Sequence, residues 1–427
     1  NKYIKTNKTY HIHLSGIVQG VGFRPMLYNY ATLHNLKGYV CNTADGLHFE
    51  FNAHEKQAHE VFSQIQAQAP TASIINKATL HQITYKEYID FSIIAGNEID
   101  VKSVLLTPDY ATCKQCKQDV IDKNNSRYRY PFTTCTVCGP RYSILKDLPF
   151  DRINTTMKPF VLCYKCKNEY DDLNNRRYFA QTISCNVCGV QMQVFNNKKE
   201  NICNGNESTL EFILKKLSNG KILAIKGVGG YLLVCDASNA QAISTLRYRK
   251  KRPNKPFAIM VKDLQQAQLY ANIQPKEKEL LESPIAPIVI LKSIQSELAL
   301  NEIAPNLNSI GIMLSYTPLF DIILQDFGKP IVATSGNISG SPIIYKNEDA
   351  IEKLSLFADF IITNNREILI PQDDSVVILS PKSKQQIILR RSRGLAPIYF
   401  NNKDFSKNYV GTGAMLKSSF TILANNN

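Results

Sequence analysis

The chain contains the sequence CKQCKQDVIDKNNSRYRYPFTTCTVCG at residues 113–139 and the sequence CYKCKNEYDDLNNRRYFAQTISCNVCG at residues 163–189. Both segments have the form C-x2-C-x18-C-x2-C, and the second begins 50 residues after the first. The similarity extends to residues between the cysteines, since Arg127 recurs as Arg177 and Tyr128 recurs as Tyr178. The sequence therefore predicts two copies of one small module.

Two CxxC turns can place four thiolates tetrahedrally around one zinc ion, and this shell leaves no position open for a reacting water. We therefore predict two structural zinc sites in a segment with few apolar residues of its own. Disulfide bonds or a redox dithiol centre are the alternatives, and the lack of a secretory signal disfavours the disulfides. Grouping within each repeat is the simplest arrangement, and an interleaved grouping is also open. The predicted ligands are Cys113, Cys116, Cys135, Cys138, Cys163, Cys166, Cys185 and Cys188.

The length of 427 residues indicates two to four domains, and 44% hydrophobic with 20% charged residues indicates a globular chain. Apolar runs are too short to span a bilayer, and the first residues lack the features of a signal peptide, so we expect a cytoplasmic protein. The formal net charge of +14 favours anionic partners.

The first hundred residues alternate between extended and helical patterns. A strand near His11–Leu14 leads through a glycine-rich turn at 16–25 to a helix at Met26–Leu36. Strands at 38–42 and 47–51, a helix at 55–68 and further extended runs at 73–83 and 91–94 follow. This order predicts a ferredoxin-like α+β domain.

The glycine-rich turn places consecutive backbone N–H groups at a helix N-terminus, a geometry that binds phosphate. Arg24 follows the turn and can add a bidentate cationic group. A tight turn with a surface arginine is the alternative. All seven histidines lie between His11 and His81, and we expect them at the surface without a catalytic role, because no carboxylate is seen to pair with them.

The segment 203–399 mixes strands and helices with glycine turns, which predicts an α/β domain. It contains no Walker or Rossmann glycine motif. The basic cluster at 247–252 could be a solvated face or a patch for nucleic acid.

The stretch Gly16 to Arg24, followed by Gly38 to Asn42, resembles the acylphosphatase signature. The resemblance implies that Arg24 binds a phosphoryl group and that Asn42 orients the attacking water. Positioning and charge stabilisation suffice for this chemistry, because an acyl phosphate has a good leaving group. The loop residues implied to share phosphate binding are Gln19, Gly20, Val21, Gly22 and Phe23.

Segments of the α/β domain resemble the YrdC-like nucleotide-binding family. Lys250 and Arg252 match its Lys-x-Arg pair, and Ser335 and Asn337 match its Ser-x-Asn pair. The family's Ser-Thr-Val strand matches at 374–376, with valine in place of threonine. The resemblance implies binding of ATP with magnesium and attack of a carbamate-like acid on the α-phosphate. The implied nucleotide-binding residues are Lys226, Lys250, Arg252, Ser335, Asn337, Asp374 and Ser375.

The order of these parts resembles the HypF family of [NiFe]-hydrogenase maturation carbamoyltransferases. It implies a multidomain α+β and α/β chain with four segments: acylphosphatase-like at 1–97, twin zinc modules at 98–202, YrdC-like at 203–399, and the start of a carbamoyltransferase domain at 400–427. The last assignment rests on Tyr409 to Lys417, which resembles that domain's opening strand, so we expect an N-terminal portion of a longer enzyme. Two residues depart from the family pattern, Ser315 for proline and Asn364 for histidine.

The family resemblance implies hydrolysis of carbamoyl phosphate to carbamate, formation of carbamoyl-adenylate from ATP, and carbamoyl transfer to a cysteine of the partner protein HypE for the iron-bound cyanide ligands. A tRNA-modifying enzyme of the threonylcarbamoyl type, an acylphosphatase with zinc binding modules, and a non-enzymatic zinc scaffold are the alternatives. An acylphosphatase-like domain has no purpose in the tRNA chemistry, so we expect no nucleic-acid partner.

Overall fold

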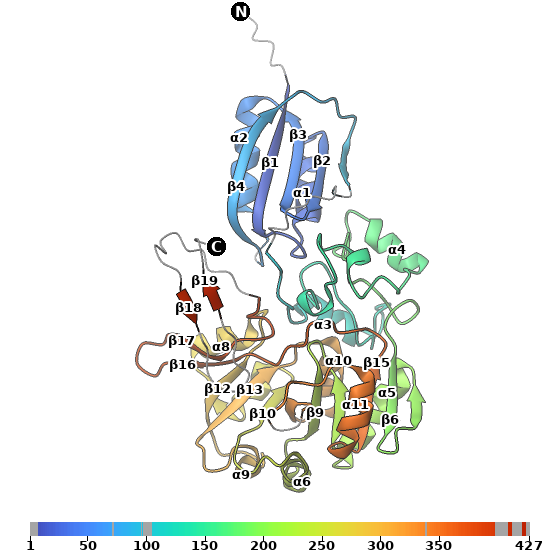
Figure 1. Cartoon of the computed structure of the whole chain (residues 1–427), viewed down its shortest axis with the longest axis vertical. Coiled ribbons are helices and arrows are strands. Elements are labelled where there is room, and N and C mark those ends of the chain that lie inside the picture. Colours follow the sequence, from blue (N-terminus) through green and yellow to red (C-terminus); the bar gives the residue numbers. More distant parts are fainter. Residues whose placement is uncertain are drawn as a thin grey trace, which may run out of the picture.

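A computed structural model describes residues 7–70, 72–94, 96, 105–337, 340–397, 409–411 and 421–423. It has a small domain at the N-terminus, a cysteine-rich region, and a large domain (Figure 1). The cysteine-rich region lies between the other two, as Figure 1 shows. The predicted domain boundaries after residues 97 and 399 fall outside the described residues, as does most of segment 400–427.

The small domain has the order strand, helix, strand, strand, helix, strand, which confirms the ferredoxin-like prediction. Its sheet has the strand order β4-β1-β3-β2-β5. Gly22 has a left-handed φ of 92° and allows the chain to enter the first helix at Phe23, three residues before the predicted start. The elements are β1 (Lys8–Ile17), α1 (Phe23–Leu33), β2 (Gly38–Thr43), β3 (Gly46–Ala53), α2 (Glu55–Ala67), β4 (Ile74–Ile83) and β5 (Phe91–Ile93).

Alternation along the strands of the small domain separates a buried face from an open one. On β1, Ile12 and Leu14 are fully buried, whereas His11 and His13 between them are half-buried. Phe49 and Phe51 of β3 lie in the same core as Leu27 of α1, so one face of the sheet packs against the helices. Each such large apolar side chain contributes about 1.5–3 kcal/mol to stability through burial.

The cysteine-rich region contains only short helices. Each repeat begins a helix directly after its first cysteine: α3 (Lys114–Ile121) follows Cys113 and α4 (Tyr164–Asp171) follows Cys163. Two short 3-10 helices, η1 (Tyr142–Ile144) and η2 (Arg152–Asn154), lie between the repeats. Cysteines form much of the two small buried clusters here, so the region has little apolar core of its own.

The large domain is built on a 12-stranded mixed sheet, which confirms the α/β prediction. Helices cover both faces: α5 and α10 pack on one, and α6, α8 and α11 pack on the other. The sheet also includes β6 and β7, most of which precedes residue 203. Its path is β17-β16-β12-β13-β10-β14-β9-β8-β15-β6-β7, with β11 paired to β12.

The strands of the large domain are β6 (Met192–Asn196), β7 (Asn201–Asn204), β8 (Leu223–Lys226), β9 (Tyr231–Asp236), β10 (Ala258–Val261), β11 (Ala271–Asn272), β12 (Ile288–Ser293), β13 (Ser309–Leu314), β14 (Ile331–Ser335), β15 (Phe360–Asn364), β16 (Val376–Leu379) and β17 (Gln386–Arg390). The helices are α5 (Asn206–Ser218), α6 (Ala240–Lys250), α7 (Leu264–Gln268), α8 (Pro275–Glu282), α9 (Leu300–Ile303), α10 (Pro318–Phe327), α11 (Asn347–Lys353) and η3 (Leu354–Leu356).

Near the C-terminus, β18 (Tyr409–Gly411) pairs antiparallel with β19 (Thr421–Leu423). In the described part of the chain, none of the helices has the length and apolar character needed to cross a bilayer.

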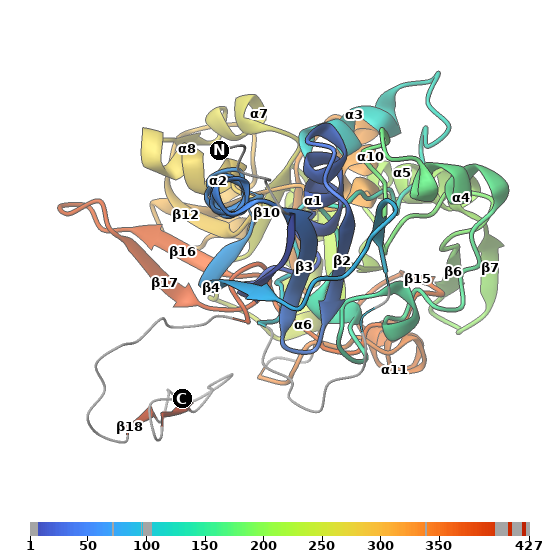
Figure 2. The same cartoon turned by 90° about the horizontal axis from the view of Figure 1, so that it is seen from above.

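The middle region contacts both domains. Seen from above, helix α3 of the first repeat lies beside α10 of the large domain (Figure 2). Lys117 of α3 donates to the backbone oxygen of Ser315 at 3.0 Å and pairs with Asp321 of α10 at 2.9 Å, which ties the first repeat to the large domain. Tyr178 of the second repeat packs edge-on against Tyr28 of α1, with ring centroids 5.7 Å apart. The two repeats therefore join the small domain to the large one.

Candidate zinc, phosphate and nucleotide sites

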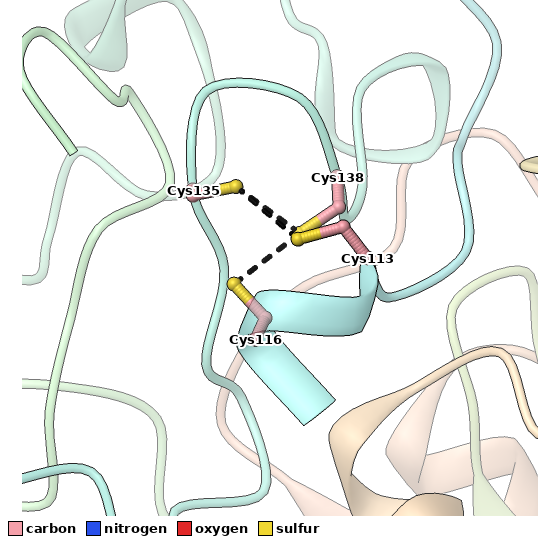
Figure 3. Close-up of side chains that lie close together, drawn as sticks. All are labelled: Cys113, Cys116, Cys135 and Cys138. Atoms are coloured by element: carbon pink, nitrogen blue, oxygen red, sulfur yellow. Dashed lines mark hydrogen bonds between the residues drawn. The ribbon is translucent and has the colours of Figure 1, made fainter. Parts of the chain in front are cut away.

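The four cysteines of the first repeat converge on one point (Figure 3). The Sγ atoms of Cys113 and Cys135 are 3.7 Å apart, and those of Cys138 lie 3.6 Å from both Cys135 and Cys116. A tetrahedron with Zn–S distances of about 2.3 Å has S···S edges of about 3.8 Å. A disulfide needs about 2.05 Å. The geometry therefore fits a zinc ion and excludes disulfides among these cysteines.

The second repeat has the same arrangement. Cys163 and Cys185 are 3.7 Å apart at Sγ, Cys185 and Cys188 are 3.8 Å apart, and Cys166 belongs to the same group. The cysteines thus group within each repeat, and the interleaved arrangement is not adopted. Two four-thiolate groups indicate zinc, since soft thiolate donors in a tetrahedron suit this ion.

An arginine of the first repeat contacts the cysteines of the second. Arg127 is 2% exposed, and its guanidinium lies 3.5 Å from Cys166 Sγ. The same side chain pairs with Glu169 at 2.6 Å and donates to the backbone oxygen of Ser184 at 3.1 Å. It therefore places positive charge beside the second thiolate group.

The reverse contact repeats the pattern. Arg177, the counterpart of Arg127, lies 3.9 Å from Cys116 Sγ, pairs with Asp119 and donates to the backbone oxygen of Thr134 at 3.0 Å. Arg176 adds a contact of 3.1 Å to Cys116 Sγ. Each repeat thus supplies a cation to the other's thiolates, which explains physically why the arginines recur with the cysteines.

Replacing Arg127 by methionine is expected to weaken zinc binding at the second repeat by about 10–100-fold, because groups that contact metal ligands tune affinity by this amount. Competition with a chromophoric chelator would measure the change. Lys167→Met is the matched control, since Lys167 follows Cys166 directly and makes an exposed pair with Asp171. Equal zinc release from the two variants would show that the Arg127 contact does not stabilise the thiolates.

The predicted phosphate loop lies between β1 and α1 with the conformation that its glycines allow. Gly20 and Gly22 have φ values of 69° and 92°, and the loop ends at the N-terminus of α1. Arg24 and Asn42 line the same pocket as these glycines, and both are buried. Asn42 Oδ1 has no hydrogen-bond partner among the described residues, so it can accept one from a water.

Side chains of the cysteine-rich region complete this pocket. Asp151 pairs with Arg24 at 2.7 Å, and the ring of Phe179 lies 5.6 Å from the Arg24 guanidinium. Arg141 donates from Nε to the backbone oxygen of Gly20 at 2.7 Å. The phosphate loop is therefore held from both sides, by its own domain and by the zinc region.

Gln19 has a positioning role in the loop. Its Nε2 donates to the backbone oxygens of Thr43 at 2.7 Å and Gly46 at 3.0 Å, and its Oε1 accepts from the Phe150 amide at 2.9 Å. The side chain thus fixes the loop against β2 and β3 and against Phe150 of the zinc region.

The seven predicted nucleotide-binding residues form three hydrogen-bonded groups. In the first, Lys250 Nζ donates to the backbone oxygen of Ser335 at 2.7 Å and to Asn337 Oδ1 at 2.8 Å. Arg252 lies beside them and donates to Thr334 Oγ1 at 3.2 Å. Burial lowers the pKa of Arg252 to about 10, and the nearby cations Arg247 and Arg390 add to this effect. A bound polyanion would relieve this repulsion.

Lys226 forms the second group. It is buried at the end of β8, and its Nζ donates to Asn347 Oδ1 at 2.6 Å and to the backbone oxygens of Asn364 at 3.2 Å and Arg366 at 2.9 Å. Burial, reinforced by Arg366, lowers the pKa of Lys226 to about 8. Strands β8 and β15 are parallel neighbours, so Lys226 and Asn364, the last residue of each, lie at the same end of the two strands.

The third group lies at the start of β16. Asp374 pairs with buried Arg393 at 2.9 Å, and Ser375 Oγ donates to the backbone oxygen of Arg393 at 2.9 Å. The Arg393 guanidinium stacks 3.6 Å from the centroid of the Tyr316 ring. Asp374 is therefore already charge-paired within the protein.

Comparison with family models gives three matches along the chain. An acylphosphatase model matches residues 10–93, and a HypF finger model matches residues 112–145 and 162–195. A model named Sua5/YciO/YrdC, described as telomere recombination, matches residues 215–392.

The carbamoyltransferase HypF of Synechocystis is 42% identical over 422 residues, which are 98% of this chain and 54% of that protein. This chain belongs to the HypF family. It spans about half the length of the curated HypF proteins that it matches.

Two solved HypF structures share the fold. The chain matches full-length HypF in its phosphate- and nucleotide-bound form with a TM-score of 0.91 and 39% identity, over 99% of this chain and 55% of that one. It matches HypF of T. kodakarensis with a TM-score of 0.88 and 37% identity, over 98% of this chain and 53% of that one.

Sequence reasoning about this HypF-family chain missed the residues that contact Arg24 and the phosphate loop from the zinc region. Asp151, Arg141 and Phe179 come from the zinc region, more than 100 positions from Arg24. They carry no motif of their own. For Arg127 and Arg177 a signal existed, because these arginines recur at equal offsets in the two repeats.

Proposed function

We propose that the chain hydrolyses carbamoyl phosphate to carbamate and phosphate and then joins the carbamate to ATP, giving carbamoyl-adenylate and pyrophosphate. The observation that carries the proposal is the presence, in one HypF-family chain, of a pocket at the phosphate loop and a separate domain with buried lysines. In the first step water attacks the phosphorus atom and carbamate leaves. In the second step a carbamate oxygen attacks the α-phosphorus of ATP and pyrophosphate leaves.

In the first step, the loop amides at residues 19–23 and the Arg24 guanidinium would hold the phosphoryl oxygens. Asn42 Oδ1 would accept a hydrogen bond from the attacking water. The P–O bond to the carbamoyl group breaks and carbamate leaves, while Arg24 stabilises the charge that develops on the phosphoryl oxygens. The pocket needs no protein nucleophile, because preorganised donors supply the main catalytic effect.

In the second step, the nucleotide-binding residues proposed from the sequence would hold ATP with magnesium. Support comes from the clustering of Lys250, Ser335 and Asn337, and from the solved HypF structure described as nucleotide-bound. Arg252 and Lys226 would contribute further positive charge toward the phosphates. Charge clustering of this kind is what phosphoryl-type transfer requires.

The carbamoyl group would pass to a cysteine of HypE as a precursor of the cyanide ligands of [NiFe]-hydrogenase. Carbamate is unstable in water, so a fixed arrangement of the two sites would favour the coupled reaction. The zinc modules would supply this arrangement, since Arg141 holds the phosphate loop and Lys117 holds the large domain. Cytoplasmic location and two zinc ions per chain belong to the same proposal.

Pyrophosphate release tests the proposal. ATP with carbamoyl phosphate is expected to give pyrophosphate, and release is expected to fall to background without carbamoyl phosphate, in Arg24→Ala and in Lys250→Ala. Lys251→Ala is the matched control, because this neighbouring lysine is exposed. Phosphate release alone, indifferent to ATP, would restrict the chain to acylphosphatase activity. Pyrophosphate release that needs threonine and bicarbonate would support the tRNA-modifying alternative.

A further inference from the structure

Histidines gather on the open face of the small domain's sheet. His13 of β1 stands opposite His48 of β3 in the strand register, and their rings stack with centroids 4.5 Å apart. His11 of β1 stacks on His48 from the other side at 5.1 Å. These rings point away from the core that contains Ile12 and Leu14, because side chains alternate along a strand.

A carboxylate faces this histidine stack. Asp45, in the turn between β2 and β3, has Oδ1 at 2.9 Å from His48 Nε2 and Oδ2 at 3.5 Å from His13 Nε2. The His13 ring also lies 3.2 Å from the backbone oxygen of Asp45. The expectation that no carboxylate pairs with the histidines is therefore wrong, because the turn brings Asp45 back beside β1.

The three groups have the spacing of a metal site. Ligand atoms of His13, Asp45 and His48 all lie within 4.8 Å of one another. The side chains are between 15% and 27% exposed, so an ion can enter from solvent. His48 Nδ1 lies 2.9 Å from His11 Nε2, and donation of its N–H to His11 would leave the His48 Nε2 lone pair toward Asp45.

We propose that His13, Asp45 and His48 bind a divalent transition-metal ion, with His11 as the positioning residue of His48. Two imidazoles and one carboxylate suit ions such as zinc, cobalt or nickel, whereas calcium and magnesium require oxygen ligands. The site differs from the two thiolate groups in its donors and in its partial exposure, so its ion exchanges faster.

The proposed ion would fix the turn between β2 and β3. The backbone oxygens of Thr43 and Gly46 on this turn accept from Gln19 Nε2, so the turn carries one side of the phosphate loop. Gln19 therefore links the turn that carries the metal site to the phosphate loop. A bound ion would restrain the loop through this link without touching the substrate.

The test uses zinc and the full chain with both four-cysteine groups loaded. Equilibrium dialysis is expected to give three zinc ions for the wild type and two for His13→Ala and for His48→Ala, with about tenfold weaker third-site binding in His11→Ala. His59→Ala, an exposed histidine on α2, is the matched control and should retain three. Two ions in the wild type, or three in both ligand variants, would overturn the proposal.

A second measurement needs no substitution. Zinc is expected to slow modification of His13 and His48 by diethyl pyrocarbonate in the wild-type chain, read by peptide mass mapping, and to leave His59 unaffected. Equal rates at all three histidines with and without the third equivalent of zinc would also overturn the proposal. Cobalt bound there should lack the thiolate-to-metal absorption of the cysteine sites, which separates the two kinds of site.

Discussion

Arg24→Ala is expected to lower kcat/KM for carbamoyl phosphate by about 10²–10³-fold, the loss typical for one preorganised donor of an anion site. Arg24 is 8% exposed and lines the pocket with Asn42 and the loop glycines. Its guanidinium can bind two phosphoryl oxygens at once. Arg24→Lys would keep the charge but lose this planar fork, so most of the loss should remain. Steady-state phosphate release measures both variants.

Asp151→Asn separates a substrate role of Arg24 from a structural one. Asp151 pairs with Arg24 at 2.7 Å, so it competes with the substrate's phosphoryl group for the same guanidinium. Its removal is expected to tighten inhibition by inorganic phosphate while hydrolysis continues. If Asp151→Asn and Arg24→Ala reduced hydrolysis equally, Arg24 would act by holding the zinc region in place, and the proposed role in phosphate binding would be wrong.

The fold of the small domain could be predicted because its pattern is local. Alternation such as His11, Ile12, His13, Leu14 reports one buried face per strand, and glycines mark the turns between elements. Helix α1 begins at Phe23 rather than Met26, since Gly22 has a left-handed conformation directly before the helix. The first residue of a helix depends on the backbone dihedral angles of the residue before it, and a pattern of hydrophobic residues does not predict these angles.

Contacts between the domains could not be predicted in the same way. Arg24 with Asp151, and Gly20 with Arg141, join residues more than 100 positions apart. Polar pairs of this kind follow no periodic pattern in the sequence. Aspartate is common in loops, so Asp151 by itself does not indicate a contact with Arg24. Asp45 was missed for a related reason, because its sequence neighbours indicate a tight turn and conceal its contact with His13 on β1.

The prediction of nucleotide-binding residues rests on motifs that match the YrdC-like family. The structure adds the hydrogen bonds and ion pairs that these residues make. Lys250 already donates hydrogen bonds to the oxygens of Ser335 and Asn337, and Asp374 is paired with Arg393. ATP with magnesium must share or replace these contacts to bind as proposed. The roles of these residues stay predictions, and the pyrophosphate assay with Lys250→Ala addresses them.

Cys135→Ser is expected to remove one zinc ion per chain and to lower carbamoyl phosphate hydrolysis by about 10²-fold, the effect of roughly 1 Å of misplacement. Cys135 is a ligand candidate of the first thiolate group, and it lies outside the residues that line the phosphate pocket. Zinc contributes about 10–16 kcal/mol in isolated finger peptides, and this region has little apolar core of its own. Loss of the ion should therefore unfold the turn at 135–138.

The turn matters for hydrolysis because of Arg141. Its guanidinium donates to the backbone oxygens of Cys138 and Thr136, each at 2.9 Å, and its Nε donates to that of Gly20 at 2.7 Å. Without a fixed turn, Arg141 can no longer hold the phosphate loop. Arg141→Met should therefore reproduce the loss of hydrolysis while zinc content stays at the wild-type value.

Cys203→Ser is the matched control, because Cys203 is half-buried and belongs to neither thiolate group. It should retain both the zinc content and the rate of the wild type. Zinc is measured by metal analysis and hydrolysis by phosphate release on the same preparations. A Cys135→Ser chain that lacks one zinc ion yet hydrolyses carbamoyl phosphate at the wild-type rate would contradict the coupling. In that case Gln19 and its bonds to the turn between β2 and β3 must hold the loop without help from the zinc module.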